Sequence, residues 1–504
     1  MNYLLTSAQM RAADEYTINE LKMPSLKLME RAGLALADEA ERLAPRGKII
    51  CVSGGGNNGG DGFVCARILL KRGRDIEVVF LAEKLSAECE INRAEYEMLG
   101  GKICSALPEG KIALLVDCLF GTGFKGEFSE PLSHLTEEMN ARKERGTKIL
   151  SADIPSGVSG DDGFAAKAAV NADVTLCIGE RKAGVYLGDG PDHAGKISCA
   201  DIGIRLPEKE PYAYAFLADK EFVSQIVKPR KRNSHKGIYG KAAIVAGSEK
   251  YTGAAYLSTL ACLRSGAGYT TLFTPSSLLP FYVLKAPEAL LESLNEGGRV
   301  AFTEDNFEKL LSYDSIAYGM GTGVSEDVAL GAEYLIKTYT GKLILDADAL
   351  NSLAKFRFDK LENLFAAKKR DVLLTPHIKE FSRLSDRTVT DILRSGTQAA
   401  TEFALRYGVS VLLKNAATVI TDGRRTAVNV TGTAGQAKGG SGDVLSGVIA
   451  GLCASGLSVF EGGLAGAYLT GKAAELAALT YGEYSLLATD VIERLGSAFL
   501  SLRS

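Results

Sequence analysis

Short runs of apolar and β-branched residues alternate with longer amphipathic stretches along almost the whole chain. In the first half, this pattern predicts strands over 48–53, 76–81, 113–117, 147–152 and 174–178, and helices over 61–72, 87–99 and 130–145. An opening helix is predicted over 7–21, with Ser7 as its N-cap. Such alternation is typical of repeated βα units on a parallel sheet.

The alternation stops once and then restarts. Residues 205–212 carry two prolines among charged residues and show no periodicity, which indicates a linker. Strands are then predicted over 241–246, 269–273, 315–318, 342–345, 371–375 and 409–413. A hairpin is predicted from 418–421 and 426–430, because Asp422-Gly423 separates them. We therefore expect two α/β domains, residues 1–210 and 220–504.

Composition narrows the class of protein. Hydrophobic residues at 46% and charged residues at 24% are typical of globular domains, and 504 residues exceed one ordinary core. A net charge of −3 gives no overall attraction to nucleic acid or anionic membranes, so we expect neither as a partner. The N-terminus lacks a secretory h-region, and no apolar run reaches membrane-spanning length, which predicts a cytoplasmic protein. The nine cysteines include no CxxC pair, which argues against zinc or a disulfide framework.

A glycine-rich segment, Gly54 to Gly62, follows the first long strand and leads into a helix. Glycines allow a ligand to approach the backbone, and a helix N-terminus attracts phosphate. One interpretation is a dinucleotide-dependent dehydrogenase, in which Glu83 is the acid that follows the next strand and binds the ribose. The polar side chains of Asn57, Asn58 and Asp61 argue against it, because that turn usually needs none.

Two further polar segments, Asp117–Glu127 and Asp153–Val158, follow other predicted strands. Because ligands of open α/β sheets bind at the carboxyl ends of strands, we expect the three segments to converge. Each alone is also consistent with a tight turn in which Asn, Asp or Ser caps the backbone.

Together NNGGDG, DCLFGTGFKGE and DIPSGV resemble the NAD(P)H-hydrate epimerases, across roughly residues 1–205. The resemblance implies a Rossmann-like three-layer sandwich and contacts to the hydrated dinucleotide from Asn57, Asn58, Gly59, Gly60, Asp61, Gly121, Thr122, Gly123, Phe124, Lys125, Gly126, Glu127 and Asp153. It also implies a potassium ion held by Asn58, Asp117 and Ser156, whose oxygen atoms suit a hard cation. Epimerisation requires proton exchange, for which Asp153 is our candidate; Asp61 is alternatively a helix cap.

A second glycine-rich segment, Gly432 to Gly447, contains Gly440-Ser441-Gly442-Asp443 at the predicted start of a helix. This arrangement is typical of ribokinase-like enzymes, in which the turn stabilises a transferring phosphoryl group and the aspartate accepts a hydroxyl proton. Polar residues also follow four upstream strands, at Gly319–Gly323, 345–351, 375–381 and 414–418.

These segments resemble the ADP-dependent NAD(P)H-hydrate dehydratases, across about residues 225–500. The resemblance implies a ribokinase-like α/β domain in which Ala254, Gly323, His377 and Asp443 contact the hydrate, with Asp443 catalytic. Glu380 would help to place magnesium. ADP would be held by Lys414, Asn415, Ala416, Ala417, Thr418, Thr433, Ala434, Gly435, Gln436, Ala437, Lys438, Gly439, Gly440, Ser441 and Gly442. Lys438 departs from the small or hydroxylated residue expected there, and its charge could neutralise a phosphate.

The two resemblances imply one function. The chain would epimerise the R and S hydrates of NADH and NADPH and then dehydrate the S form, with ADP as phosphoryl donor, to give NAD(P)H, AMP and phosphate. We also expect a homo-oligomer.

Two alternatives stay open at this point. The C-terminal domain is compatible with a small-molecule kinase, which shares the GxGD chemistry, and the N-terminal domain with a non-catalytic binding module. The basic segment 228–236 is compatible with nucleic-acid binding, but in a chain of balanced charge we favour a solvated linker edge or an electrostatic funnel for dinucleotide phosphates.

Overall fold

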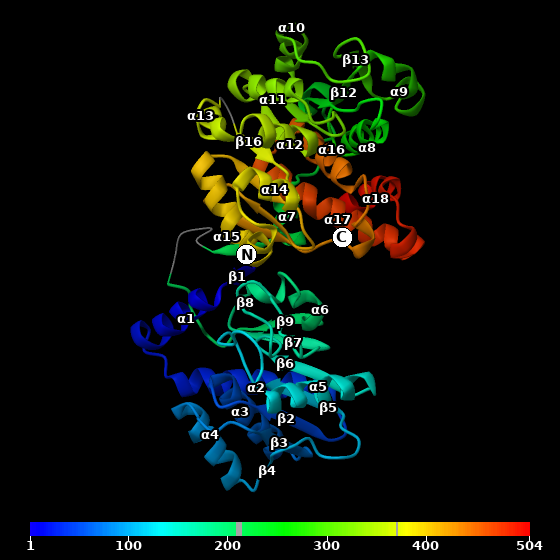
Figure 1. Ribbon diagram of the computed structural model, residues 1–504. Coiled ribbons are helices and arrows are strands. Elements are labelled where there is room, and N and C mark those ends of the chain that lie inside the picture. The colour runs from blue at the N-terminus through cyan, green and yellow to red at the C-terminus, as the bar shows by residue number, and fades with distance from the viewer. Residues whose placement is uncertain (208–213, 369–370, 504) are drawn as a thin grey trace. The chain divides into compact units, whose positions relative to one another are not determined.

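The computed structural model describes residues 1–207, 214–368 and 371–503. Two compact units divide the chain, Asn2–Tyr214 and Ala215–Ser504, and both are α/β as the sequence predicts (Figure 1). Of the predicted linker 205–212, residues 208–212 lie outside the described residues.

The N-terminal unit is built on a seven-stranded sheet with the order β4-β3-β2-β5-β6-β7-β9. Every neighbouring pair in this sheet is parallel. The strands are β2 (Ile49–Ser53), β3 (Ile76–Phe80), β4 (Lys102–Cys104), β5 (Leu114–Cys118), β6 (Lys148–Ala152), β7 (Val174–Ile178) and β9 (Lys196–Ala200). Two short strands, β1 (Tyr3–Leu5) and β8 (Arg181–Lys182), pair with each other.

Helices cover both faces of this sheet, which is why every residue of β2 is buried. Alternate residues of β2 belong to two separate cores, Cys51 to one and Val52 to the other. The first core includes side chains from α2 (Ser25–Leu43), α3 (Asn57–Lys71) and α4 (Ala87–Met98); the second includes side chains from α5 (Glu130–Glu144). The remaining helices of this unit are α1 (Ser7–Glu15), the π-helical turn η1 (Tyr16–Glu20), η2 (Ala183–Val185) and α6 (Gly190–Ala194).

Two predicted helix starts are wrong. The N-cap of α1 is Thr6, not Ser7, because the Thr6 hydroxyl accepts from the amide of Gln9 and the Gln9 side chain accepts from the amide of Thr6. α3 begins at Asn57, not near residue 61, so NNGGDG forms the first turns of the helix itself. Asp61 is therefore not the cap of α3.

The C-terminal unit contains a larger mixed sheet, in which the strands of this unit follow the order β13-β12-β11-β14-β15-β16-β17-β18-β19-β10. Pairing is parallel from β13 to β17 and antiparallel across the predicted hairpin. The strands are β10 (Ala215–Leu217), β11 (Lys241–Val245), β12 (Tyr269–Thr274), β13 (Leu290–Ser293), β14 (Ser315–Tyr318), β15 (Lys342–Leu345), β16 (Val372–Leu374), β17 (Ser410–Leu413), β18 (Thr418–Thr421) and β19 (Thr426–Asn429).

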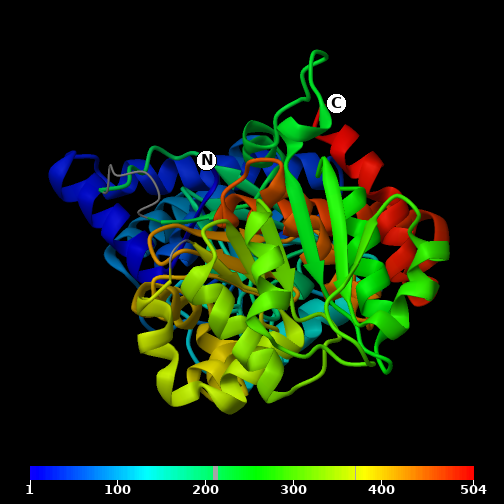
Figure 2. The same ribbon diagram turned by 90° about the horizontal axis from the view of Figure 1, so that it is seen from above.

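Two glycine- and alanine-rich helices, α16 (Ser441–Ala454) and α17 (Val459–Ser485), are packed within this unit. All residues of α16 from Val444 onward are buried, against the sheet, α8 (Thr252–Leu263) and α17. Figure 2 shows the orange helices behind the green strands β11 and β12. The other helices are α7 (Lys220–Ile226), η3 (Lys236–Tyr239), η4 (Ser276–Leu278), α9 (Leu279–Lys285), α10 (Glu304–Glu308), η5 (Lys309–Ser312), α11 (Glu326–Thr338), α12 (Ala347–Phe356), η6 (Phe358–Lys360), α13 (Leu361–Ala366), α14 (Ile378–Ser385), α15 (Val389–Tyr407), η7 (Ala434–Gln436) and α18 (Ala488–Ser501).

Within the residues that the structure describes, no helix is long and apolar enough to cross a bilayer. The nine cysteines are free thiols, and most of them are buried.

The buried aromatic core of the N-terminal unit provides a stability test. Phe63 is fully buried, and its ring lies 5.5 Å from that of Phe80 and 6.2 Å from that of Tyr96. Phe63→Ala should lower the free energy of unfolding of this unit by about 3–5 kcal/mol, measured by hydrogen exchange. Met98→Ala is the control, since Met98 is 84% exposed, and a cost of similar size there would contradict the core assignment.

Candidate active sites

The N-terminal unit contains a cavity of about 560 Å³ at the carboxyl edge of its sheet. Its walls come from the residues that follow β2, β5, β6 and β7, together with α1 and α2. β2 and β5 are neighbours, but the chain passes through β3 and β4 before it returns to β5. Loops from the two strands therefore diverge and leave a crevice, as expected at a topological switch point.

Glycines allow the two loops at this crevice to meet. A Cβ at Gly54 would lie 2.0 Å from the carbonyl oxygen of Leu119, in the loop after β5. A Cβ at Gly59 would lie 1.8 Å from the carbonyl oxygen of Gly54. Neither position accepts a side chain without movement of the backbone, so these glycines shape the site even though they do not line it.

The structure brings most of the predicted N-terminal residues together. Those that line the cavity are Asn57, Asn58, Asp61, Gly121, Thr122, Gly123, Phe124 and Asp153. Those that do not line it are Gly59, Gly60, Lys125, Gly126 and Glu127. Glu83, the acid of the dehydrogenase reading, is also outside the lining. Four ionisable residues that the sequence analysis missed also lie in the lining: Arg11, Asp14, Glu88 and Lys182.

Lys182 and Asp153 form an ion pair at this cavity. The lysine side chain is only 1% exposed, and its ammonium group also donates to the carbonyl oxygen of Ile178 at 2.6 Å. Burial lowers the pKa of Lys182, but the charge and hydrogen bond of Asp153, together with contributions from Cys177 and Cys199, outweigh it, so the net shift is upward and the lysine stays protonated. Asp153 itself has a left-handed backbone, with φ of 70°, and also accepts from the amide of Ile178 at 3.0 Å.

Two further carboxyl groups at the cavity titrate abnormally. Burial raises the pKa of Asp61 well above its usual range, and the charges of Asp153 and Asp14 raise it further. Burial also raises the pKa of Asp14 to about 6, although the charge of Lys182 opposes the shift. The cavity therefore combines a charged lysine–aspartate pair with two acids that favour their neutral forms.

The three residues predicted to hold potassium lie beside this cavity. Ser156 donates to Asp117 Oδ1 at 2.6 Å, and its amide donates to Oδ2 at 2.9 Å. Ser151 and the amide of Leu119 also donate to the carboxylate, at 2.8 Å and 3.3 Å. Burial raises the pKa of Asp117, while these hydrogen bonds oppose the shift. Asn58 has a buried amide nitrogen without a partner among the described residues.

The second site lies at the carboxyl edge of the C-terminal sheet, where α16 begins. Gly440 has φ of 99°, which a side chain rarely adopts, and it directs the first turn of α16 away from the preceding loop. The amides of that turn have no partner within the helix and are available to an anion. Asp443 stands in the same turn.

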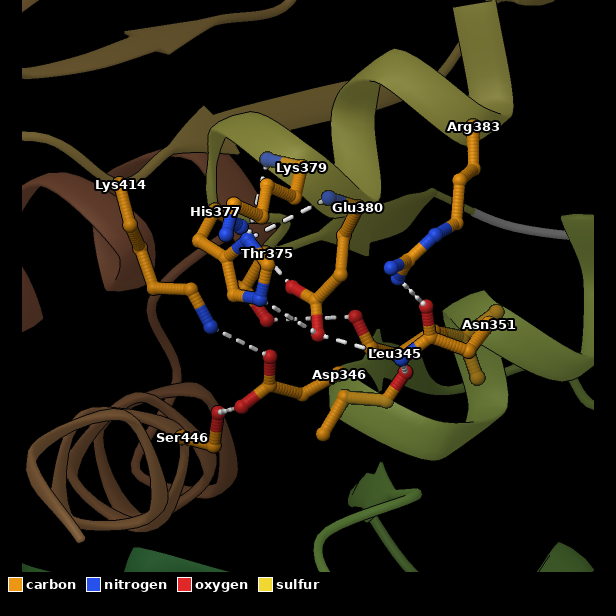
Figure 3. A network of polar contacts seen from close by, with 11 residues as sticks. Leu345, Asp346, Asn351, Thr375, His377, Lys379, Glu380, Arg383, Lys414 and Ser446 are labelled. Atoms are coloured by element: carbon orange, nitrogen blue, oxygen red, sulfur yellow. Dashed lines mark hydrogen bonds and ion pairs between the residues drawn. The ribbon is translucent and has the colours of Figure 1, made fainter. Parts of the chain in front are cut away.

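Figure 3 shows a lysine–aspartate pair, Lys414 with the buried Asp346. The charges of both residues act on the pKa of Asp443. Lys414, at the end of β17, contacts Asp346 Oδ1 at 2.7 Å, and Ser446 donates to Asp346 Oδ2 at 2.6 Å. Burial raises the pKa of Asp443 to about 7; the charge of Asp346 adds to the shift, and that of Lys414 opposes it. The sequence analysis includes Asp346 only within the polar segment 345–351 and predicts no role for it.

His377 and Glu380 form the capping box of α14. In Figure 3 they lie above Asp346. His377 Nδ1 accepts from the amides of Lys379 and Glu380, at 3.1 Å and 3.3 Å. The ring proton of a neutral His377 is therefore on Nε2, which lies 3.4 Å from Glu380 Oε1. Burial lowers the pKa of His377, although the Glu380 charge opposes the shift.

Ala254 and Gly323 lie at the switch point of this sheet, between the ends of β11 and β14. A Cβ at Gly321 would lie 2.8 Å from that of Ala254, so the turn after β14 touches the start of α8. The amide of Gly323 donates to Asp348 Oδ2 at 2.8 Å. Asp348 in turn raises the pKa of Asp443, which places Gly323 beside the same cluster.

The predicted ADP loop, residues 433–442, is tied to the junction of α17 and α18. Lys438 donates to the carbonyl oxygens of Tyr484 and Leu486, at 2.6 Å and 2.9 Å, and Thr433 hydrogen-bonds Glu483. Two of the three N–H groups of the Lys438 ammonium thus donate to backbone carbonyl oxygens, and one is left to donate elsewhere. Gly442 adjoins Lys414, since a Cβ there would lie 3.4 Å from its Nζ.

The basic segment 228–236 lies away from the dehydratase-like site. Its residues line a separate cavity of about 860 Å³, together with the C-terminal ends of α16 and α18. Asp443 is at the opposite end of α16. This position argues against an electrostatic funnel into that site.

The chain matches two family models. One is described as NAD(P)H-hydrate dehydratase and matches residues 242–496; the other is described as YjeF-related protein N-terminus and matches residues 25–184. A bifunctional NAD(P)H-hydrate repair enzyme of Moorella thermoacetica is 34% identical to this chain, covering 98% of the chain and 96% of the relative. The enzyme of the same description from Escherichia coli is 31% identical, covering 96% and 92%.

The C-terminal unit is also similar to a solved structure. The ADP/ATP-dependent NAD(P)H-hydrate dehydratase of Bacillus subtilis, co-crystallised with ATP and Mg²⁺, is 31% identical, with a TM-score of 0.50. The match covers 57% of this chain and 98% of the Bacillus chain. Relatives that match both units nearly end to end show that the chain belongs to the family of bifunctional NAD(P)H-hydrate repair enzymes, with an epimerase unit followed by a dehydratase unit.

Proposed function

We propose that the two lysine–aspartate pairs organise the two reactions, which take place at separate sites. The observation that carries this proposal is the position of Asp443, in the free first turn of α16 beside the Asp346–Lys414 pair. The substrates are the hydrates of NADH and NADPH, with a nucleoside diphosphate at the second site. Residues 1–210 and 220–504 are the proposed catalytic domains, and a homo-oligomer remains a prediction that size-exclusion chromatography would test.

At the N-terminal site, Asp153 is the proposed base for epimerisation. Its carboxylate is paired with Lys182 and can accept the hydroxyl proton of the hydrate. Loss of this proton opens the ring at the carbon–nitrogen bond, and closure on the other face inverts the configuration. Asn57, Asn58 and the loop Gly121–Phe124 line the cavity and position the dinucleotide.

We propose that potassium binds at Asn58, Asp117 and Ser156. Their donor atoms are oxygens, which suit a hard cation, and the Ser156 and Asp117 side chains are already in contact. Asp117 accepts four hydrogen bonds, so coordination would require the Ser156 hydroxyl to turn its proton away. Turning the Asn58 amide over would present its oxygen where the unpartnered nitrogen lies. The ion would supply a fixed positive charge for the substrate phosphates.

At the C-terminal site, Asp443 is the proposed base for phosphoryl transfer. Hydroxide is a poor leaving group, so the terminal phosphoryl of ADP is transferred to the ring hydroxyl as Asp443 takes its proton. Phosphate then leaves, driven by the ring nitrogen lone pair, together with a proton from the neighbouring carbon. NAD(P)H, AMP and phosphate result. The amides of Gly440–Gly442 stabilise the charge that develops on the phosphoryl oxygens.

The nucleotide lies, in this proposal, between the 414–418 segment and the 433–442 loop. The ammonium group of Lys414 adjoins Gly442 and can move from Asp346 to a phosphate. Magnesium would neutralise the phosphates, and Glu380 would hold it through water. Glu380 Oε1 has no contact shorter than 3.4 Å with the described residues, which leaves it free to accept from a metal-bound water.

Asp443→Asn separates the two activities. With NADH hydrate, ADP, Mg²⁺ and K⁺, the variant should recover NADH at least about 10²-fold more slowly, because a proton acceptor is lost. R/S exchange, followed by chromatography of the epimers, should continue at the wild-type rate. Loss of both activities would contradict separate sites, and replacement of ADP by ATP in the wild-type assay measures the nucleotide preference.

The pH profile of the dehydratase tests the state of Asp443. A base must be ionised to act, so a pKa raised to about 7 predicts that the rate increases as pH rises through about 7. Asp346→Asn removes a neighbouring negative charge and frees Lys414, so the rise should move to lower pH. A profile that is flat between pH 5 and 9 would exclude Asp443 as the base.

Lys182→Met tests the pair at the epimerase site. The variant keeps the volume of the side chain but leaves Asp153 without its counter-charge, which disfavours the charged carboxylate. R/S exchange should fall and should partly recover at higher pH, while dehydration of the S hydrate is unchanged. Lys196→Met, at an exposed position of β9, is the matched control and should exchange normally.

A further inference from the structure

The epimerase cavity contains a carboxyl group that the reaction described above does not use. Asp14 is the penultimate residue of α1, and it lines the cavity with Asp61, Asp153 and Lys182. α1 precedes the sheet, so Asp14 belongs to none of the three strand-end segments that carry the family motifs.

Asp14 has no structural partner that would explain its position. Its side chain makes no hydrogen bond or ion pair with any residue of the described ranges, and Thr6 and Gln9 alone form the capping box of α1. A half-buried carboxyl group without a partner is costly, and such groups in a cleft are frequently functional.

The charges around Asp14 suit proton exchange near neutral pH. Burial raises its pKa to about 6, the charge of Asp153 adds to the shift, and that of Lys182 opposes it. The pKa of Asp61 is also raised, chiefly by burial, and the charges of Asp153 and Asp14 add to the shift. Asp14, with a pKa of about 6, can both give and take a proton near neutral pH.

Ring opening requires an acid as well as a base. When Asp153 takes the hydroxyl proton, the oxygen electrons form a carbonyl bond and the carbon–nitrogen bond breaks toward nitrogen. The nitrogen then needs a proton to become a stable open-chain amine. After rotation of the carbonyl carbon, the same two groups reverse these transfers and close the ring with the opposite configuration.

We propose that Asp14 is this acid, the second proton-transfer residue of the epimerase, which protonates the ring nitrogen while Asp153 deprotonates the hydroxyl. The inference rests on the proposed role of Asp153. It assigns opposite duties to two carboxyl groups of one cavity: Asp153, which is paired with Lys182, and Asp14, which is half-buried without a partner among the described residues.

Asp14→Asn in the full-length protein tests the assignment. The amide that replaces the carboxyl group still donates hydrogen bonds but transfers no proton, so kcat for R/S exchange should fall by about 10²- to 10⁴-fold with little change in KM. Glu20→Gln is the matched control, since Glu20 is exposed and does not line the cavity, and it should leave exchange unchanged. Dehydration of purified S hydrate reports in both variants that the chain is folded.

The pH profile separates acid catalysis from binding. Wild-type exchange should decline as pH rises above about 6, where Asp14 loses its proton, and the slower exchange of Asp14→Asn should lack this decline. Asp14→Glu keeps an acid and should restore part of the rate and the decline. Wild-type kcat in Asp14→Asn, or an effect confined to KM, would overturn the inference. Asp153→Asn is measured in parallel: if it exchanges normally, the assignment of the base has failed as well.

Discussion

A buried lysine–aspartate pair lies at the centre of each site, Lys182 with Asp153 in one unit and Lys414 with Asp346 in the other. Neither charge would be tolerated alone at these depths, since removing one partner leaves an uncompensated charge in a poorly solvated place. The charges of each pair shift the pKa values of the neighbouring carboxyl groups. The remaining carboxyl groups then adjust their protonation to that fixed distribution of charge.

Both sites therefore contain a lysine–aspartate pair, but they differ in which carboxyl group is the proposed base. In the epimerase unit, the paired aspartate is itself the proposed base, and its unpaired neighbours Asp14 and Asp61 are held toward their neutral forms. In the dehydratase unit, the paired aspartate, Asp346, contacts Lys414 and accepts a hydrogen bond from Ser446. The proposed base is Asp443, which is not part of the pair. One site therefore offers acid and base together, as ring opening needs. The other offers a base beside a free helix N-terminus, as phosphoryl transfer needs.

Sheet topology explains where a crevice can open in each unit. Both sheets contain a switch point, between β2 and β5 in one and between β11 and β14 in the other. Loops that leave these strands diverge, so a crevice opens outside the carboxyl ends of the strands, and the packing of helices on the sheet is not interrupted. Glycines at Gly54, Gly59 and Gly321 then let neighbouring loops touch. Asp153, Asp346 and Lys414 directly follow β6, β15 and β17, whose residues are mostly buried.

The sequence by itself determined the two α/β units, the long strands and the strand-end motifs, because local periodicity and turn chemistry encode them directly. Asp61, Asp153 and Asp443 were found in this way; the structure places Asp61 and Asp153 in the lining of the N-terminal cavity and Asp443 in the first turn of α16. Short strands such as β8 and β13 were missed, since so few residues leave no periodic signal. Lys182 and Asp14 were missed for another reason: each is a single charged residue outside any motif. Only the tertiary structure brings them within reach of Asp153, from β8 and α1, and a contact between such distant segments leaves no trace in their spacing along the chain.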